Sequence, residues 1–159
     1  MSERVIIDTD PGIDDALAIL FALHSPELQI SAITTVSGNV PVEVATRNVF
    51  RIMSLMPPPL RFPVAKGAPN PLQKKPIYSF GFHGDDGLGG LDRLQDNAGS
   101  PRYPESSMTL SNRNAAVEIL YQLSTTSQPI TIIALGPLTN IAAAILKDKD
   151  TFFLKRLLL

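Results

Sequence analysis

The sequence contains no cysteine, and neither sign of charge dominates it. Without cysteine the protein has no disulfide bond, no thiolate metal site and no cysteine nucleophile. Its 14 lysine and arginine residues nearly balance its 15 aspartate and glutamate residues, and no sustained basic stripe occurs. A nucleic acid or an anionic membrane surface is therefore not an expected partner, because both are recognised by concentrated positive charge.

Long hydrophobic runs are also missing. The longest one, residues 16–23, is too short to cross a bilayer. Only three consecutive apolar residues, 5–7, precede the first acidic cluster. Three residues are too few for the core of a signal peptide. Hydrophobic residues still make up 44% of the 159 residues, enough for one packed core. These features predict a single domain over residues 1–159, located in the cytoplasm and without a membrane partner.

Apolar segments alternate along the chain between the periodicities of strands and helices. Apolar and β-branched runs predict four strands, at residues 5–7, 28–36, 62–65 and 130–135. Helical spacing, acidic first turns and proline stops predict helices at residues 14–23, 42–56, 114–123 and 138–146. The segment from residue 67 to about 109 is rich in glycine, proline and aspartate, and it is predicted to be a long functional or mobile loop.

This alternation predicts an α/β fold, with a mostly parallel sheet and flanking helices joined by right-handed crossovers. In the common strand order 3-2-1-4, the first and fourth strands are neighbours at the topological switch point. Ligands bind there, beyond the carboxyl ends of the strands. The loops after Ile7, Val36 and Leu135 are then expected to meet at one crevice, and the polar motifs lie on these loops.

Four aspartates, Asp8, Asp10, Asp14 and Asp15, fall within eight positions at the end of the first predicted strand. Carboxylates this close repel one another, and a hard divalent cation bound through oxygen would compensate for the repulsion. The alternative is a solvated turn in which Asp14 caps the following helix. The spacing alone leaves both interpretations open.

Four motifs together carry a resemblance to a known family. They are DTDPGIDDA at residues 8–16, SGNV at 37–40, HGDDGLGG at 83–90 and GPLTN at 136–140. In this order and spacing the sequence resembles the inosine–uridine-preferring nucleoside hydrolases. The resemblance implies a Rossmann-like nucleoside hydrolase fold. It also implies calcium-dependent hydrolysis of the N-glycosidic bond of purine or pyrimidine ribonucleosides, which releases ribose and the free base.

The resemblance further implies roles for individual residues. Three groups would bind Ca²⁺: the side chains of Asp10 and Asp15 and the backbone carbonyl of Leu135. Asp10 would also act as the general base toward the attacking water, and Asp8 would support the calcium-binding residues. Asp14 and Asn39 would bind ribose hydroxyls. These residue types suit the reaction, because a carboxylate can take a proton from water while an oxocarbenium-like sugar develops.

His83 and Asn39 each have a second interpretation. His83 could act as a catalytic acid toward the leaving base, since histidine exchanges protons near neutral pH. A flexible surface loop accounts for His83 equally well. Asn39 could be a turn residue that tolerates unusual backbone angles, although the family resemblance favours the ribose contact.

Two rival functions stay open at this point. The Asp8-Thr9-Asp10 sequence after a strand also fits the Asp-x-Asp nucleophile motif of haloacid-dehalogenase-like phosphatases, whose later lysine and acidic pair we cannot place here. The other rival is a non-catalytic calcium-binding half-domain. The resemblance implies a longer, homo-oligomeric protein whose carboxyl-terminal half adds a further aspartate ligand. Residues 147–159 are then expected to lead into a following strand, and this truncated amino-terminal half is expected to be a poor catalyst.

Overall fold

The computed structural model describes residues 2–57, 60–73, 75, 78 and 81–154. Four parallel strands form a sheet in the order β3-β2-β1-β4, which is the common order that the sequence analysis assumed. The strands are β1 (Glu3–Thr9), β2 (Leu28–Thr35), β3 (Val64–Lys66) and β4 (Thr131–Ala134). The helices are α1 (Ile13–His24), α2 (Val42–Met53), α3 (Ala115–Thr125), α4 (Thr139–Lys147) and α5 (Lys149–Leu154), with a 3-10 turn η1 (Leu91–Arg93).

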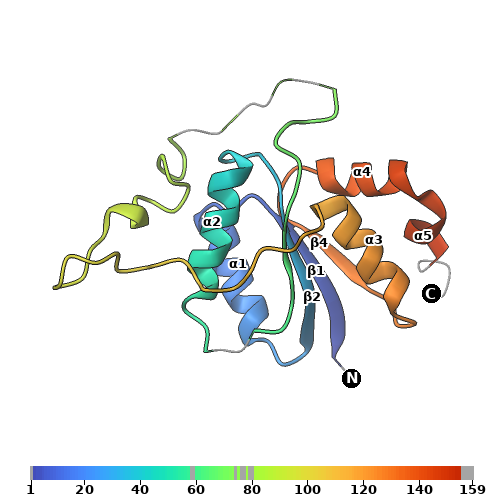
Figure 1. The fold of residues 1–159 in the computed structure, drawn as a ribbon, viewed down its shortest axis with the longest axis horizontal. Coiled ribbons are helices and arrows are strands. Elements are labelled where there is room, and N and C mark those ends of the chain that lie inside the picture. The colour runs from blue at the N-terminus through green and yellow to red at the C-terminus, as the bar shows by residue number, and fades with distance from the viewer. Residues whose placement is uncertain (1, 58–59, 74, 76–77, 79–80, 155–159) are drawn as a thin grey trace.

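Helices cover both faces of the sheet, α1 and α2 on one face and α3 to α5 on the other (Figure 1). Successive residues of a strand face opposite sides. Ile7 therefore packs in the core with α1 and α2, whereas its neighbour Ile6 packs in the core with α3, α4 and α5. Burial on both faces explains why residues 5–7 in the middle of β1 form an uninterrupted apolar run. Within the described residues, no helix has the length and apolarity needed to cross a membrane.

Among the element boundaries that differ from the sequence prediction, those of β3 and α2 have a clear local cause. β3 begins at Val64 rather than at residue 62, because Pro63 has no N–H to contribute to the sheet. The helix predicted over residues 42–56 ends at Met53. Leu55 and Met56 each donate to the carbonyl three residues earlier, at 3.1 Å, so that the chain closes in tight turns instead of a further helical turn.

The last described segment is the helix α5, which the sequence analysis did not predict. Asp148 caps α5: its Oδ1 accepts the Thr151 N–H at 3.0 Å and its Oδ2 accepts the Thr151 hydroxyl at 2.7 Å. Phe152 is 6% exposed and completes the core next to α3 and α4. Residues 155–159, which belong to the segment expected to lead into a following strand, lie outside the described residues.

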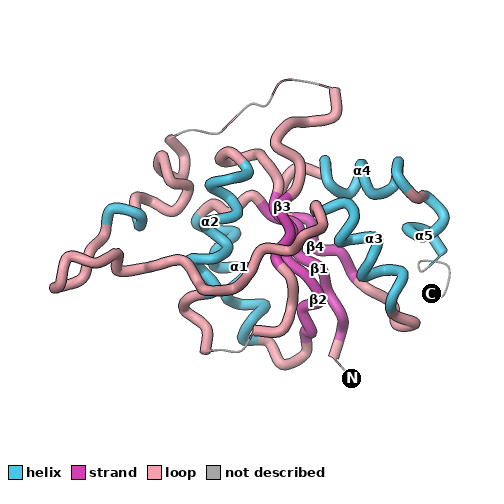
Figure 2. Tube along the Cα trace, viewed as in Figure 1, coloured by secondary structure: helices cyan, strands magenta, loops and turns pink. Residues whose placement is uncertain are grey.

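The long segment between β3 and α3 runs past α2 with little regular structure (Figures 1 and 2). It includes η1 and a short antiparallel bridge between Gln95 and Pro101. The segment returns to the sheet beside β3, where Leu110 pairs with Val64 and the Ser111 N–H donates to the Val64 carbonyl at 2.8 Å. Both ends of the long loop are therefore attached to the same short strand.

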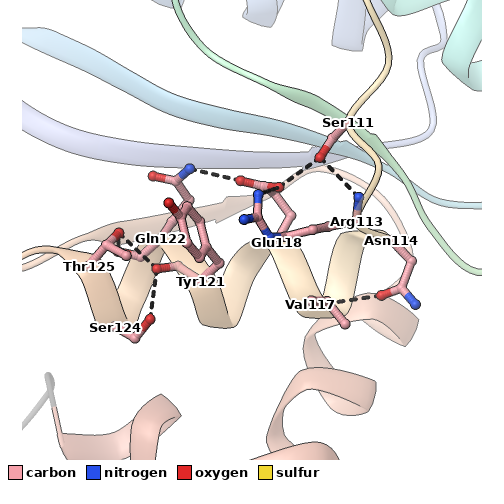
Figure 3. Close-up of polar contacts among 9 residues, drawn as sticks. All are labelled: Ser111, Arg113, Asn114, Val117, Glu118, Tyr121, Gln122, Ser124 and Thr125. Atoms are coloured by element: carbon pink, nitrogen blue, oxygen red, sulfur yellow. Dashed lines mark hydrogen bonds and ion pairs between the residues drawn. The ribbon is translucent and has the colours of Figure 1, made fainter.

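A polar cluster fixes this return to α3 (Figure 3). Glu118 is 1% exposed, and its carboxylate accepts hydrogen bonds from the Ser111 hydroxyl at 2.9 Å and the Gln122 amide at 2.8 Å. The Arg113 guanidinium lies 3.6 Å from the same carboxylate and 3.7 Å from the centre of the Tyr121 ring. The buried charge is thus both paired and hydrogen-bonded, which offsets the cost of removing it from water.

Candidate active site

The loops that follow β1, β2 and β4 meet at the carboxyl edge of the sheet, as the strand order predicts. The Val36 N–H donates to the Thr9 carbonyl at 3.0 Å, and the Leu135 N–H donates to the Asp8 carbonyl at 2.8 Å. These bonds extend the pairing of β1 with its two neighbours. The aspartate-rich turn is therefore flanked by the SGNV motif on one side and the GPLTN motif on the other.

Asp10 lies at the centre of this edge and is 4% exposed. Its carboxylate sits between two glycines: a Cβ atom at Gly136 would lie 2.5 Å from Oδ1, and a Cβ atom at Gly38 would collide with Oδ2. The Asn39 N–H donates to Oδ2 at 2.5 Å, and the Asn39 side-chain amide donates to the Asp10 carbonyl at 3.3 Å. Glycine is required on both sides because the carboxylate occupies the space of a side chain.

Asp15 and Asp14 are adjacent on α1 but lie in opposite environments. Asp15 is 6% exposed and its Oδ2 accepts the Gly12 N–H at 2.9 Å, which closes the start of the helix. The Asp14 side chain is 81% exposed. The N-cap position is Gly12, so the alternative in which Asp14 caps the helix was wrong. Asp14 is instead exposed to solvent beside the aspartate-rich turn, where a ligand can reach it.

The buried carboxylates at this edge hold their protons more tightly than usual. Burial raises the pKa of Asp10 to about 6; the Asn39 N–H opposes this rise, and the charges of Asp15 and Asp8 add to it. The pKa of Asp15 is raised as well, first by burial and also by the charge of Asp14. The sequence predicts repulsion among these clustered carboxylates, and the fold brings them close enough for it to raise the pKa values of Asp10 and Asp15.

Asp8 lies behind Asp10 and is fully buried. Its Oδ1 accepts the Thr34 hydroxyl at 2.5 Å and the Asn140 amide at 2.8 Å. Its Oδ2 is buried without a hydrogen-bond partner among the described residues. Burial raises the pKa of Asp8 to about 6 despite the two hydrogen bonds. Asp8 is thus held by Thr34 and Asn140, and its supporting role toward the calcium-binding residues stays a prediction.

Asn140 connects more of the site than any pattern in the sequence indicates. Its Nδ2 donates to the Asp8 carboxylate and to the Thr35 carbonyl, both at 2.8 Å, and its Oδ1 accepts the Ala68 N–H at 2.9 Å. One 2% exposed side chain at the start of α4 therefore joins the carboxyl ends of β1 and β2 to the segment that follows β3. A Cβ atom at Gly67 would collide with the Asn140 amide, so the chain passes directly over it. The available signal was the position of Asn140 just after a strand-ending Gly-Pro turn.

His83 comes from the long loop and packs on the first turn of α1. The Ile13 N–H points at its Nδ1 over 3.4 Å, and its Nε2 lies 3.7 Å from Oδ1 of Asp14. The side chain is 15% exposed. The ring therefore contacts the aspartate-rich turn.

Asp10 and Asp15 fit a divalent cation as part of its ligand set. Both pKa values are raised, and the positive charge of an ion would favour the ionised forms. Leu135 directly precedes Gly136, which packs on Asp10. Across the described parts of the chain, no group of three or more His, Asp or Glu side chains is placed to hold a metal ion. A calcium ion would need further oxygen ligands, because calcium takes roughly six to eight.

The sequence model of the family described as inosine-uridine preferring nucleoside hydrolase matches residues 5–157. The chain belongs to this family. Membership in the nucleoside hydrolases confirms the resemblance carried by the four motifs. It also decides against the haloacid-dehalogenase-like phosphatase that the Asp8-Thr9-Asp10 sequence had left open.

Proteins with similar sequences and proteins with similar solved structures are both named as nucleoside hydrolases. The pyrimidine-specific ribonucleoside hydrolase RihA of Salmonella agona is 41% identical over 142 residues, which are 89% of this chain and 42% of that protein. A solved inosine-guanosine nucleoside hydrolase has a TM-score of 0.82 at 33% identity and covers 95% of this chain and 44% of its own. A purine-preferring ribonucleoside hydrolase from Gardnerella vaginalis has a TM-score of 0.78 at 30% identity, covering 94% and 45%. The chain spans less than half the length of these relatives.

Proposed function

We propose that the full-length protein containing these residues is a calcium-dependent nucleoside N-ribohydrolase. It would cleave ribonucleosides to ribose and free base. The observation that carries this proposal is the setting of Asp10, a buried carboxylate with a pKa of about 6 held between Gly38 and Gly136 at the switch point of the sheet. Membership in the nucleoside hydrolase family supports the class of reaction.

Asp10 is proposed to take the proton from the attacking water. A carboxylate with a pKa of about 6 is ionised at neutral pH, yet it accepts a proton more readily than an ordinary aspartate. The Asn39 N–H occupies Oδ2, so Oδ1 is the atom assigned to the water. Asp10, Asp15 and the Leu135 carbonyl would hold calcium, which when bound orients the water and lowers its pKa.

Asp14 and Asn39 are proposed to hold the ribose hydroxyls, and His83 to donate a proton to the departing base. The exposed Asp14 carboxylate and the His83 ring lie together beside the aspartate-rich turn, 3.7 Å apart. Donation to the base requires the doubly protonated ring, which becomes neutral when it gives up one proton. In that form Nδ1 carries a proton and no longer accepts the Ile13 N–H, which lies 3.4 Å away, and the donor to the base is Nε2. That nitrogen is the one beside Asp14, where the ribose would be bound. The two side chains can therefore act on neighbouring parts of one nucleoside.

The proposed substrate class is the ribonucleosides, without a preference between bases. The relatives are named as pyrimidine-specific, inosine-guanosine and purine-preferring enzymes, so uridine and inosine are the substrates to compare. A cytoplasmic location and a homo-oligomeric state belong to the same proposal, through the resemblance to this family.

The test is release of free base by the full-length protein from inosine and uridine, before and after treatment with a chelator. We expect base release to stop after chelation and to return with added calcium. Base release that is indifferent to chelation would contradict the calcium requirement. Calcium binding in a calorimeter without base release from either nucleoside would favour the non-catalytic calcium-binding protein instead.

A further inference from the structure

Two adjacent aspartates in the HGDDGLGG motif lie in opposite environments. The Asp85 side chain is 84% exposed and its carboxylate pairs with Arg93 at 3.1 Å on the surface. Asp86 is 5% exposed and faces inward. Its Oδ1 accepts the N–H groups of Leu88 at 3.0 Å and Gly90 at 2.7 Å, and its Oδ2 accepts the N–H of Asp92 at 3.1 Å. One carboxylate thus gathers three backbone amides of the loop.

The loop around Asp86 is closed on itself. The Gly89 N–H donates to the His83 carbonyl at 2.7 Å, and the Gly87 N–H donates to the Gly84 carbonyl at 3.0 Å. Gly84, Gly87 and Gly89 have φ angles of 79°, 79° and 72°, a left-handed conformation that other residues rarely adopt. These turns direct the amides inward, and Asp86 supplies the acceptor that they need. Burial would raise the pKa of Asp86, but the amides of Gly90, Asp92 and Leu88 outweigh it and lower the pKa.

Asn48 of α2 attaches this closed loop to the aspartate-rich turn. Its buried side-chain amide donates to the Asp86 carbonyl at 2.7 Å and to the Pro11 carbonyl at 3.4 Å. A Cβ atom at Gly87 would lie 3.0 Å from the Pro11 carbonyl oxygen, so the loop and the turn are in direct contact. The loop is therefore docked on the scaffold within one residue of Asp10.

We propose that Asp86 is a positioning residue, which holds His83 against the first turn of α1 so that the ring stays beside Asp14. Asp86 does not act on a ligand itself, because it is buried and both of its oxygens accept backbone N–H groups. It acts through the loop, whose closing bond runs from Gly89 to the His83 carbonyl. The catalytic consequence rests on the proposed proton donation by His83.

Asp86→Asn in the full-length protein tests this, with Asp85→Asn as the matched control. Asparagine keeps the shape but places an NH₂ group where a carboxylate oxygen accepts N–H donors. Hydrogen exchange of peptides covering residues 81–94 reports on the loop. The imidazole NMR signal of ¹³C-labelled histidine, assigned with His83→Gln, reports on the ring. Turnover is measured with inosine and with p-nitrophenyl riboside, whose nitrophenolate leaves without being protonated.

In Asp86→Asn we expect faster exchange over residues 81–94, a displaced or broadened His83 signal, and a loss of inosine turnover on the order of 10-fold or more. Turnover of p-nitrophenyl riboside should change less than about twofold, since it needs no general acid. Asp85→Asn should resemble the parent protein in every measurement.

Faster exchange with an unmoved His83 signal would overturn the proposal, because Asp86 would then stabilise the loop without positioning the ring. The turnover of both substrates by His83→Gln tests proton donation by His83 separately from the positioning role of Asp86. Equal losses with both substrates in that variant would refute proton donation by His83, whereas the NMR signal in Asp86→Asn would still decide whether Asp86 positions the ring. An Asp86→Asn protein with an altered unfolding temperature remains informative, because the ratio of the two turnover rates does not depend on the folded fraction.

Discussion

The Asp10 carboxylate and the Gly136 backbone are in direct contact, since a Cβ atom at position 136 would lie 2.5 Å from Oδ1. Gly38 closes the other side of the same carboxylate. The two glycines come from loops that follow different strands, so the position of the proposed base depends on the register of β1 with β2 and β4. The sheet itself therefore fixes where Asp10 can lie.

Gly136→Ala is expected to lower kcat of the full-length protein by on the order of 100-fold, because a displacement of about 1 Å in a catalytic group can cost that much. The measurement is steady-state hydrolysis of inosine and uridine. Gly99→Ala is the control: a Cβ atom there would meet nothing within 4 Å, and the strain from its φ of 78° falls in an exposed loop, so kcat should stay unchanged even if stability falls. Retention of normal turnover in Gly136→Ala would show that Asp10 is not held by this contact.

Asp10→Asn is expected to reduce turnover more than nucleoside binding, because it keeps oxygen ligation but loses a base with a pKa of about 6. Asp10→Ala should abolish calcium-dependent hydrolysis, since it removes both the ligand and the base. Nucleoside affinity is measured by calorimetry and turnover by base release. Near-normal turnover in either variant would refute the role of Asp10.

Asn140→Ala is expected to destabilise the protein by about 3 kcal/mol, because it leaves buried partners on three segments unsatisfied. Asn114→Ala is the matched control. Asn114 caps α3 through a hydrogen bond to the Val117 N–H at 3.0 Å, and the loss of such a cap costs about 1 kcal/mol. Urea unfolding measures both, and similar midpoints would contradict the connecting role of Asn140.

The stability of the calcium-free protein is expected to depend on pH through Asp8. Burial raises the pKa of Asp8 from 3.8 to about 6 in the folded protein, so the folded state binds this proton more tightly than the unfolded chain does. The contribution is complete below the unfolded pKa and is lost as the pH rises through about 6. Asp8→Asn removes the titration.

The free energy of unfolding of Asp8→Asn should therefore rise relative to the parent between pH 4 and pH 7. The expected size is roughly 1.4 kcal/mol for each unit of pKa shift. Urea unfolding in the presence of a chelator measures it at each pH. A difference that stays constant over this range would show that Asp8 remains ionised throughout.

The 159-residue chain on its own is expected to bind calcium weakly and to hydrolyse nucleosides slowly. It offers two carboxylates and one carbonyl, from Asp10, Asp15 and Leu135, to an ion that takes roughly six to eight oxygen ligands. Calorimetric titration with calcium, together with an inosine and uridine assay, measures both properties. Tight binding with turnover equal to that of a full-length relative would show that these groups suffice, or that a second copy supplies the others.

The strand order and the meeting of the loops at Asp10 could be predicted because they follow from local patterns. Apolar runs of strand and helix length alternate, parallel connections are right-handed, and the loops at one end of such a sheet must meet. The aspartate-rich turn lies on one of these loops, so its location could be predicted without knowledge of its tertiary contacts. The later start of β3 and the helix α5 were missed, because one proline and one capping aspartate decided them.

The sequence by itself determined the family, the topology and the position of Asp10. Only the tertiary structure decided which polar side chains are buried. Asp85 and Asp86 are identical in type and adjacent in sequence, yet one is exposed and the other gathers three amides. Asn140 likewise bonds to Asp8 across 132 positions, and the Ile13 N–H reaches His83 across 70. Local periodicity carries no signal for such pairs, because burial and hydrogen bonding depend on neighbours that become adjacent only when the sheet and its loops have formed.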